Sequence, residues 1–206
     1  MKKAIKTVVF DQGKVLLDFS PEKIFSPYFS DPNDMALLHT LVFESKDWEK
    51  VDAGEMLEIE ALDRWLKGAP ERLHGAITEM FDHWHEYMTP VPGMLELVQA
   101  LKKNGYHCYL LSNTSPRYYT FYRKVEVMRL LDGHIISAIH RLYKPEPAIY
   151  QRLFETYSLD PEECFFVDDV AENLEAGRRL GMRGFQFVDF DVDGLKKALI
   201  QEGVQL

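Results

Sequence analysis

The sequence predicts an α/β fold: a doubly wound parallel sheet whose chain is interrupted by an all-helical insertion. Three observations support this fold class. Short, nearly continuous apolar runs recur along the chain and alternate with amphipathic segments of helical length. The segment 18–89 contains no such run. Polar residues follow directly after several runs, as expected where buried strands end at a binding site.

Five apolar runs are predicted to form the strands of the sheet. They cover residues 5–10, 106–111, 134–139, 164–167 and 183–188. Helices are expected between them at 94–104, 146–157 and 171–180, and Gly105 and Gly181 mark two of the helix ends. Strand, helix and strand at this spacing predict a parallel sheet with helices on both faces.

The insertion after the first strand is predicted to be helical throughout. Apolar periodicity indicates helices at 34–43, 55–66 and 71–87, and proline- and glycine-containing segments separate them. The segment 89–93, with two prolines and a glycine, indicates the hinge back into the sheet. We therefore expect an α/β core formed by residues 1–17 and 90–206 and a cap formed by residues 18–89.

Composition and charge exclude several classes of protein. The chain has 206 residues, with 33 acidic and 24 basic side chains and a net charge of −9, which argues against a nucleic-acid partner. No run approaches the roughly 18 apolar residues of a membrane span. The apolar stretch that follows Lys3 is too short for the apolar region of a signal peptide. Cys108 and Cys164 read as reduced core residues. We expect a cytoplasmic monomer or homodimer acting on a small molecule.

The polar residues at the predicted strand ends carry the chemistry. The first strand delivers Asp11, the second Ser112, and the fourth Asp168 and Asp169, while Lys144 lies in the loop after the third. Clustered carboxylates repel one another unless a cation neutralises them, and Mg²⁺ prefers such oxygen ligands. A carboxylate there can also form an aspartyl-phosphate. Lysine and serine would hold the transferred phosphoryl oxygens.

These residues occur in four motifs that resemble those of the haloacid dehalogenase superfamily. The motifs are Phe10–Leu16 (FDQGKVL), Leu110–Thr114 (LLSNT), Lys144–Pro147 (KPEP) and Phe166–Asp169 (FVDD). The resemblance covers the whole chain, because the helical insertion is similar to the family's cap. The details are most similar to bacterial α-D-glucose-1-phosphate phosphatases and to the amino-terminal phosphatase domain of epoxide hydrolases.

The resemblance implies a role for each motif residue. Asp11 is implied to be the nucleophile, Ser112 and Asn113 to bind the phosphate, and Lys144 to be the stabilising cation. The implied ligands of Mg²⁺ are Asp11, Asp169 and the backbone carbonyl of Gly13, with Asp168 as a further ligand or as outer-shell support. Asn173 is implied to steady the water shell of the metal.

Two positions depart from the family pattern. Most family phosphatases have an aspartate two positions after the nucleophile as general acid and base, and Gly13 occupies that place, although the glucose-1-phosphate subgroup tends to have glycine there. Such a group is worth about 10² to 10⁴ in rate, so we expect slow turnover or a base borrowed from the cap. At position 14 the family prefers glycine or asparagine. Lys14 therefore adopts a different backbone geometry or costs local strain.

The cap is expected to choose the substrate. By resemblance, the stretch around residues 48–55 presents a specificity loop to the site, with Trp48, Lys50 and Asp52 as candidate substrate contacts. The alternative is an ordinary connection between helices.

The leading hypothesis is a Mg²⁺-dependent phosphatase that acts on a small phosphomonoester, with a sugar phosphate as one candidate. A second hypothesis is a 2-haloacid dehalogenase that uses the same aspartate through an ester and needs no metal. The Asp168–Asp169 pair argues against it, because unneutralised acids disfavour an anionic substrate. A third is a catalytically impaired, metal- or phosphate-binding regulatory member.

Overall fold

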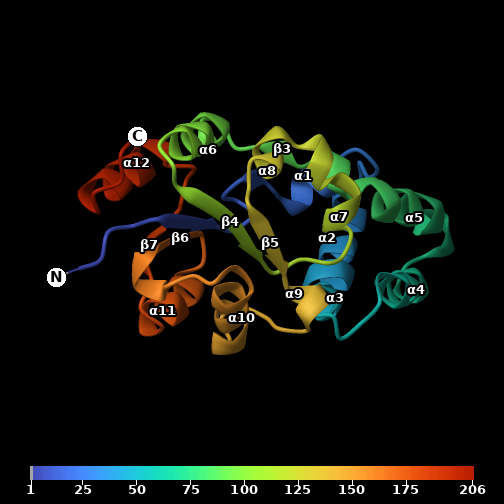
Figure 1. Cartoon of the computed structure of the whole chain (residues 1–206). Helices are drawn as coiled ribbons and strands as arrows, with labels where there is room; N and C mark the ends of the chain where they lie inside the picture. Colours follow the sequence, from blue (N-terminus) through green and yellow to red (C-terminus); the bar gives the residue numbers. More distant parts are fainter. Residues whose placement is uncertain (1) are drawn as a thin grey trace.

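The computed structural model describes residues 2–206. Its centre is a five-stranded parallel sheet of β1 (Thr7–Phe10), β4 (His107–Ser112), β5 (Gly133–Ile136), β6 (Cys164–Asp168) and β7 (Arg183–Gln186). The strand order is β5-β4-β1-β6-β7 (Figure 1). The strand order changes direction at β1, so ligands are expected at the carboxyl ends of the strands next to it.

Helices cover both faces of the sheet, as the sequence predicts. On one face lie α6 (Met94–Lys103) and α12 (Val192–Gln201), and on the other lie α10 (Pro147–Tyr157) and α11 (Ala171–Arg179) (Figure 1). Successive residues of β1 alternate between the two cores, Val8 packing with α6 and Val9 with α10. Both are fully buried.

Strands β1, β4, β6 and β7 agree with the predicted runs to within about two residues at each end, and β5 differs more from its predicted run. The expected strand 134–139 ends at Ile136, and a single helical turn, α9 (Ser137–His140), follows it. The Ser137 side chain explains the early end, because its hydroxyl accepts from the Thr114 backbone N–H and donates to backbone carbonyls. Two further short helices, α7 (Tyr118–Phe121) and α8 (Glu126–Arg129), connect β4 to β5.

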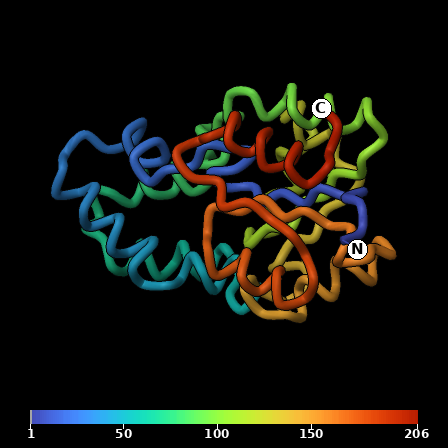
Figure 2. Tube along the Cα trace, turned by 90° about the vertical axis from the view of Figure 1, so that its left-hand side faces the viewer, coloured from blue at the N-terminus to red at the C-terminus, as the bar shows by residue number. Residues whose placement is uncertain are grey.

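The segment between the two short strands β2 (Leu17–Asp18) and β3 (Thr89–Pro90) is helical. The helices are α1 (Pro21–Phe25), α2 (Pro32–His39), α3 (Asp47–Asp52), α4 (Glu58–Gly68) and α5 (His74–His83), with a π-helical turn at Thr40–Glu44 and 3₁₀ turns at Glu71–Leu73 and Trp84–Tyr87. They gather at one end of the molecule, away from α11 and α12 (Figures 1 and 2). The sequence reading misses α1 and α3, which are too short to show a periodic apolar stripe.

The chain enters and leaves this helical segment side by side. The two-residue strands β2 (Leu17–Asp18) and β3 (Thr89–Pro90) pair antiparallel, and the Val91 backbone N–H donates to Leu16 O at 3.0 Å. Because β2 and β3 pair, the residues that precede the helical segment lie beside those that follow it. Among residues 2–206, no helix is long and apolar enough to cross a membrane, and Cys108 and Cys164 are both free and buried.

Candidate active site

Asp11 lies one residue beyond β1, at the carboxyl edge of the sheet. Its backbone N–H still donates to Val167 O of β6 at 2.9 Å, so the strand pairing fixes where its side chain begins. The chain then turns sharply, and the Leu16 and Leu17 N–H groups both donate to Gln12 O, at 3.0 and 2.9 Å. The Asp11 side chain is 13% exposed, so one side of it remains open to the cavity above.

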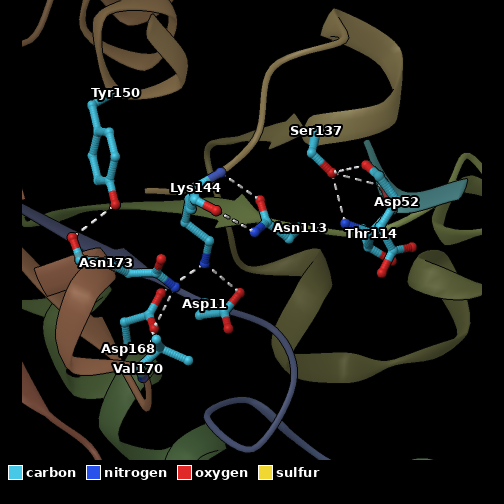
Figure 3. A network of polar contacts seen from close by, with 10 residues as sticks. All are labelled: Asp11, Asp52, Asn113, Thr114, Ser137, Lys144, Tyr150, Asp168, Val170 and Asn173. Atoms are coloured by element: carbon cyan, nitrogen blue, oxygen red, sulfur yellow. Dashed lines mark hydrogen bonds and ion pairs between the residues drawn. The ribbon is translucent and has the colours of Figure 1, made fainter. Parts of the chain in front are cut away.

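Lys144 forms ion pairs with one aspartate of the first motif and one of the fourth. Its Nζ lies 2.9 Å from Asp11 Oδ1 and 2.7 Å from Asp168 Oδ2, and its side chain is only 1% exposed (Figure 3). Asn113 fixes the backbone of Lys144 by two hydrogen bonds, accepting from Lys144 N at 2.8 Å and donating to Lys144 O at 3.0 Å. Asn113 therefore positions Lys144, a role that the sequence reading did not assign.

Asp168 is fully buried and all its contacts are internal. Its Oδ1 accepts from the Val170 N–H at 2.9 Å and from Asn173 Nδ2 at 3.0 Å (Figure 3). The Tyr150 hydroxyl in turn donates to Asn173 O at 2.7 Å. Asn173 thus contacts Asp168 directly. No signal in the sequence indicates this role of Tyr150, because its position on the buried face of α10 is that of an ordinary core residue.

The three aspartates converge on one point. Asp11, Asp168 and Asp169 each offer an oxygen, and these oxygens lie within 4.8 Å of one another. With Lys144 the four side chains carry a formal charge of −3 + 1 = −2. A divalent cation matches that charge, and carboxylate oxygens at such separations are the donor set that Mg²⁺ prefers. The residues therefore fit a magnesium ion.

Burial changes the acidity of this cluster. Desolvation raises the pKa of Asp11 to about 6, the nearby charge of Asp168 adds to the rise, and Lys144 opposes it. Burial and the charge of Asp168 likewise raise the pKa of Asp169. Both pKa values are raised because several carboxylates lie together in a poorly hydrated place without a divalent cation, which disfavours their charged forms.

The cavity above Asp11 has a polar floor and an apolar roof. The floor consists of Asp11, Gln12 and Gly13 from the first motif and Ser112, Asn113 and Thr114 from the second. The roof consists of Phe19, Trp48, Trp84, Met88 and Asp52, and the cavity has about 470 Å³ of space not filled by atoms. Ser112 is 2% exposed and lies on this floor, as expected.

The structure brings two of the three candidate cap residues to the cavity. Trp48 and Asp52 of α3 line it. Lys50 does not belong to the lining, and its Nζ lies 3.4 Å from Asp47 on the same helix. Because successive helix positions are rotated by about 100°, Lys50 points away from the face that carries Trp48 and Asp52.

Lys14 takes the strained option of the two that the sequence leaves open. Its φ is +57°, the left-handed region that costs a side chain about 1 to 2 kcal/mol. Its Nζ lies 3.9 Å from Asp169 Oδ2, so it adds positive charge beside the carboxylate cluster.

Curated relatives include several phosphatases. The chain is 27% identical to a sesquiterpene phosphatase of Aspergillus oryzae, over 89% of this chain and 90% of that protein. It is 26% identical to a D-ribitol-5-phosphate phosphatase of Bacteroides thetaiotaomicron, over 88% and 91%. It is 24% identical to a flavin mononucleotide hydrolase of Arabidopsis thaliana, over 93% and 78%.

Solved structures share the fold. A haloacid dehalogenase family enzyme of Bacteroides thetaiotaomicron has a TM-score of 0.72 and 22% identity, covering 94% of this chain and 99% of that one. An L-2-haloacid dehalogenase of Xanthobacter autotrophicus with covalently bound chloropropionic acid has a TM-score of 0.67 and 18% identity, over 98% and 85%. The haloacid dehalogenase-like hydrolase model matches residues 5–181. Together with the four motifs at the strand ends, this match places the chain in the haloacid dehalogenase-like hydrolase family, as an enzyme.

Proposed function

We propose that this enzyme is a Mg²⁺-dependent phosphatase that hydrolyses a small phosphomonoester through an aspartyl-phosphate on Asp11. The observation that carries the proposal is the pairing of Lys144 with both Asp11 and Asp168, at 2.9 and 2.7 Å, beneath a cavity that Asp11 lines. This contact holds the Asp11 carboxylate in place and leaves its other side facing the cavity. A carboxylate held in this way is suited to in-line attack on phosphorus.

Each residue of the floor has a defined task in the proposal. A magnesium ion held by Asp11, Asp168, Asp169 and the Gly13 carbonyl would neutralise phosphoryl charge and polarise the phosphorus. The Ser112 hydroxyl binds a phosphoryl oxygen by hydrogen bonding, and Lys144 offsets the charge on the attacking carboxylate. Asn113 holds the Lys144 backbone, and Asn173 holds Asp168.

The roof of the cavity indicates the class of leaving group. Phe19, Trp48, Trp84 and Met88 are apolar along most of their surface, and Asp52 is the one carboxylate that the helical segment contributes to the lining within residues 2–206. A polyol would leave its hydroxyl groups without partners against these side chains. We therefore propose an aromatic or otherwise apolar leaving group, with a sugar phosphate as the alternative.

The relatives span both alternatives. By their names, one acts on a sesquiterpene and another on D-ribitol 5-phosphate. The choice therefore depends on the residues of the roof rather than on the motifs of the floor.

We propose that residues 18–89 act as the cap and, together with 1–17 and 90–206, exclude macromolecular substrates. Trp48 and Asp52 contact the leaving group in this proposal, and Lys50 contributes charge outside the cavity. The carboxylate cluster favours a phosphatase over the metal-free dehalogenase, because three acids without a cation would repel a 2-halo acid.

The experiment is a panel of phosphomonoesters assayed with and without Mg²⁺. It includes p-nitrophenyl phosphate, 2-phenylethyl phosphate, D-ribitol 5-phosphate and α-D-glucose 1-phosphate. We expect Mg²⁺-dependent phosphate release, fastest with the two apolar esters, and a loss on the order of 10⁴-fold or more in Asp11→Asn. Chloride release from a 2-halo acid that a chelator leaves unchanged would support the dehalogenase instead. Metal binding without turnover of any ester would support the regulatory alternative.

A further inference from the structure

The position two residues after the nucleophile has no side chain. Gly13 occupies it, and a Cβ built there meets nothing within 4 Å, so the cavity has open space where an acidic group could stand. Phosphomonoester hydrolysis through an aspartyl-phosphate needs two proton transfers, one to the leaving oxygen and one from the attacking water. On the floor of the cavity, Asp11 is the one carboxylate among the described residues, and it is the nucleophile.

A second carboxylate enters the same cavity from the opposite side. Asp52, the last residue of α3, lines the cavity together with Asp11 and Gly13 and is 9% exposed. Trp48 and Trp84 lie beside it in the roof. Burial raises the pKa of Asp52 well above its usual range, and the charges of Glu58 and Asp11 raise it further, while hydrogen bonds from Trp48 and the Ser115 backbone oppose the rise. Burial in this environment favours the protonated carboxyl over the carboxylate, and the protonated form is the one that can donate a proton.

The core fixes the position of Asp52. The Ser137 hydroxyl donates to the backbone carbonyl of Asp52 and accepts from the Thr114 N–H at 2.8 Å, so one side chain ties α3 to the loop after β4 (Figure 3). Two residues on, Gly54 has a φ of +73° and sits so close to the core that a Cβ would lie 2.5 Å from Ala138 O. These contacts hold the end of α3 against the α/β core rather than leaving it free in the helical segment.

We propose that Asp52 is the general acid and base of the reaction, in the place of the side chain that Gly13 lacks. This inference rests on the proposed phosphatase function. In the first step an Asp11 oxygen bonds to phosphorus, the bond from phosphorus to the leaving oxygen breaks, and that oxygen takes the proton of Asp52. In the second step a water oxygen bonds to phosphorus and gives its proton to the Asp52 carboxylate. The bond between phosphorus and Asp11 breaks, which releases phosphate and restores both aspartates.

The test compares two esters that differ in their need for an acid. The leaving oxygen of 2-phenylethyl phosphate must be protonated, whereas p-nitrophenolate leaves without a proton. In Asp52→Asn we expect kcat/KM for 2-phenylethyl phosphate to fall by about 10² to 10⁴-fold, with a change below about tenfold for p-nitrophenyl phosphate. Because water attack also lacks its base, p-nitrophenolate should appear in a burst of one equivalent per enzyme, followed by slow turnover.

Two further variants separate a chemical role from a structural one. Asp47→Asn removes another buried carboxylate from α3, one that pairs with Arg64 at 3.1 Å and does not line the cavity. We expect it to leave the ratio of the two kcat/KM values unchanged. Gly13→Asp in the Asp52→Asn background places a carboxyl in the open space at position 13, and we expect it to restore turnover of 2-phenylethyl phosphate.

The outcomes distinguish this inference from the proposed function. If Asp52→Asn lowers both esters equally without a burst, or lowers neither, Asp52 is not the acid and base although the phosphatase stands. If the unmodified enzyme hydrolyses neither ester with Mg²⁺, the phosphatase itself is wrong and the role of Asp52 falls with it.

Discussion

Lys144 is the side chain on which the candidate site depends most. Its ammonium group is almost completely buried and has two carboxylate partners. The sequence predicts its presence in the site, because the loop that follows a parallel strand begins at the carboxyl edge of the sheet. The sequence does not predict that Lys144 contacts Asp168 as well as Asp11, because that contact depends on how α10 and α11 pack.

Replacing this lysine should cost stability as well as activity. We expect Lys144→Met to lower the free energy of unfolding by about 3 to 5 kcal/mol without metal, because it leaves two buried carboxylates without their cation. Addition of Mg²⁺ should recover part of the loss. Urea denaturation at pH 7 with and without Mg²⁺ measures both effects.

An exposed lysine serves as the control. Lys67 pairs with Asp63 on the surface of α4 and its side chain is 74% exposed. Lys67→Met should cost less than about 1 kcal/mol. Equal losses in the two variants would contradict the account of Lys144.

Among the elements, helix α3 is one that sequence patterns do not predict. The helix has six residues, and its preceding residue, Lys46, has a φ of +63°. Neither feature leaves a periodic signal, and the resemblance to the family located only the stretch around it. The close approach of Gly54 to Ala138 is a tertiary contact between segments more than 80 residues apart.

We expect Gly54→Ala to displace the end of α3 from the core. The added methyl group meets Ala138 O and the backbone has positive φ, which together cost about 1 to 3 kcal/mol. The substitution should also lower kcat, because Asp52 moves with the helix end. Gly75→Ala in α5 is the matched control, since its Cβ meets nothing within 4 Å. Thermal unfolding and ester hydrolysis of both variants check this, and similar behaviour of the two would contradict it.

The edge strand β5 carries a pH-sensitive contact. The Tyr118 hydroxyl lies 2.6 Å from His134 Nδ1 and can donate to it only while that nitrogen is unprotonated. Burial lowers the pKa of His134 below its usual value of 6.5 and raises the pKa of Tyr118. The unfolded chain therefore binds a proton at His134 more readily than the folded chain does, and the contribution of His134 to stability falls as the pH drops below about 6.5.

The measurement is the free energy of unfolding at pH 7, 6 and 5. Within the window below pH 6.5, His134 contributes a slope of at most about 1.4 kcal/mol per pH unit. We expect His134→Gln to remove this slope from the pH dependence of the unmodified protein, while His39→Gln, at an exposed histidine, keeps it. The same slope in all three proteins would show that the Tyr118–His134 contact plays no part.

For the whole molecule, repeated apolar runs were enough to predict the parallel sheet and its two covered faces. Buried strands such as 164–168 have no polar residue before their carboxyl end, so their limits are visible in the sequence. The strand order was not predictable from the runs, because a buried run does not show which strands flank it. The paired crossings of β2 and β3 were not predictable either, because they depend on a two-residue contact without a pattern. Of the site, the motif residues were predictable, and the positioning contacts of Asn113, Ser137 and Tyr150 were not.

The central claim is that Asp11 becomes phosphorylated during turnover. The most direct test mixes the enzyme with Mg²⁺ and p-nitrophenyl phosphate, quenches it in acid within one turnover, and examines the peptide containing Asp11 by mass spectrometry. We predict one phosphoryl group on Asp11, formed and lost at rates compatible with turnover, and none in Asp11→Asn. Steady release of phosphate without any adduct on this peptide, and with activity retained in Asp11→Asn, would contradict the account.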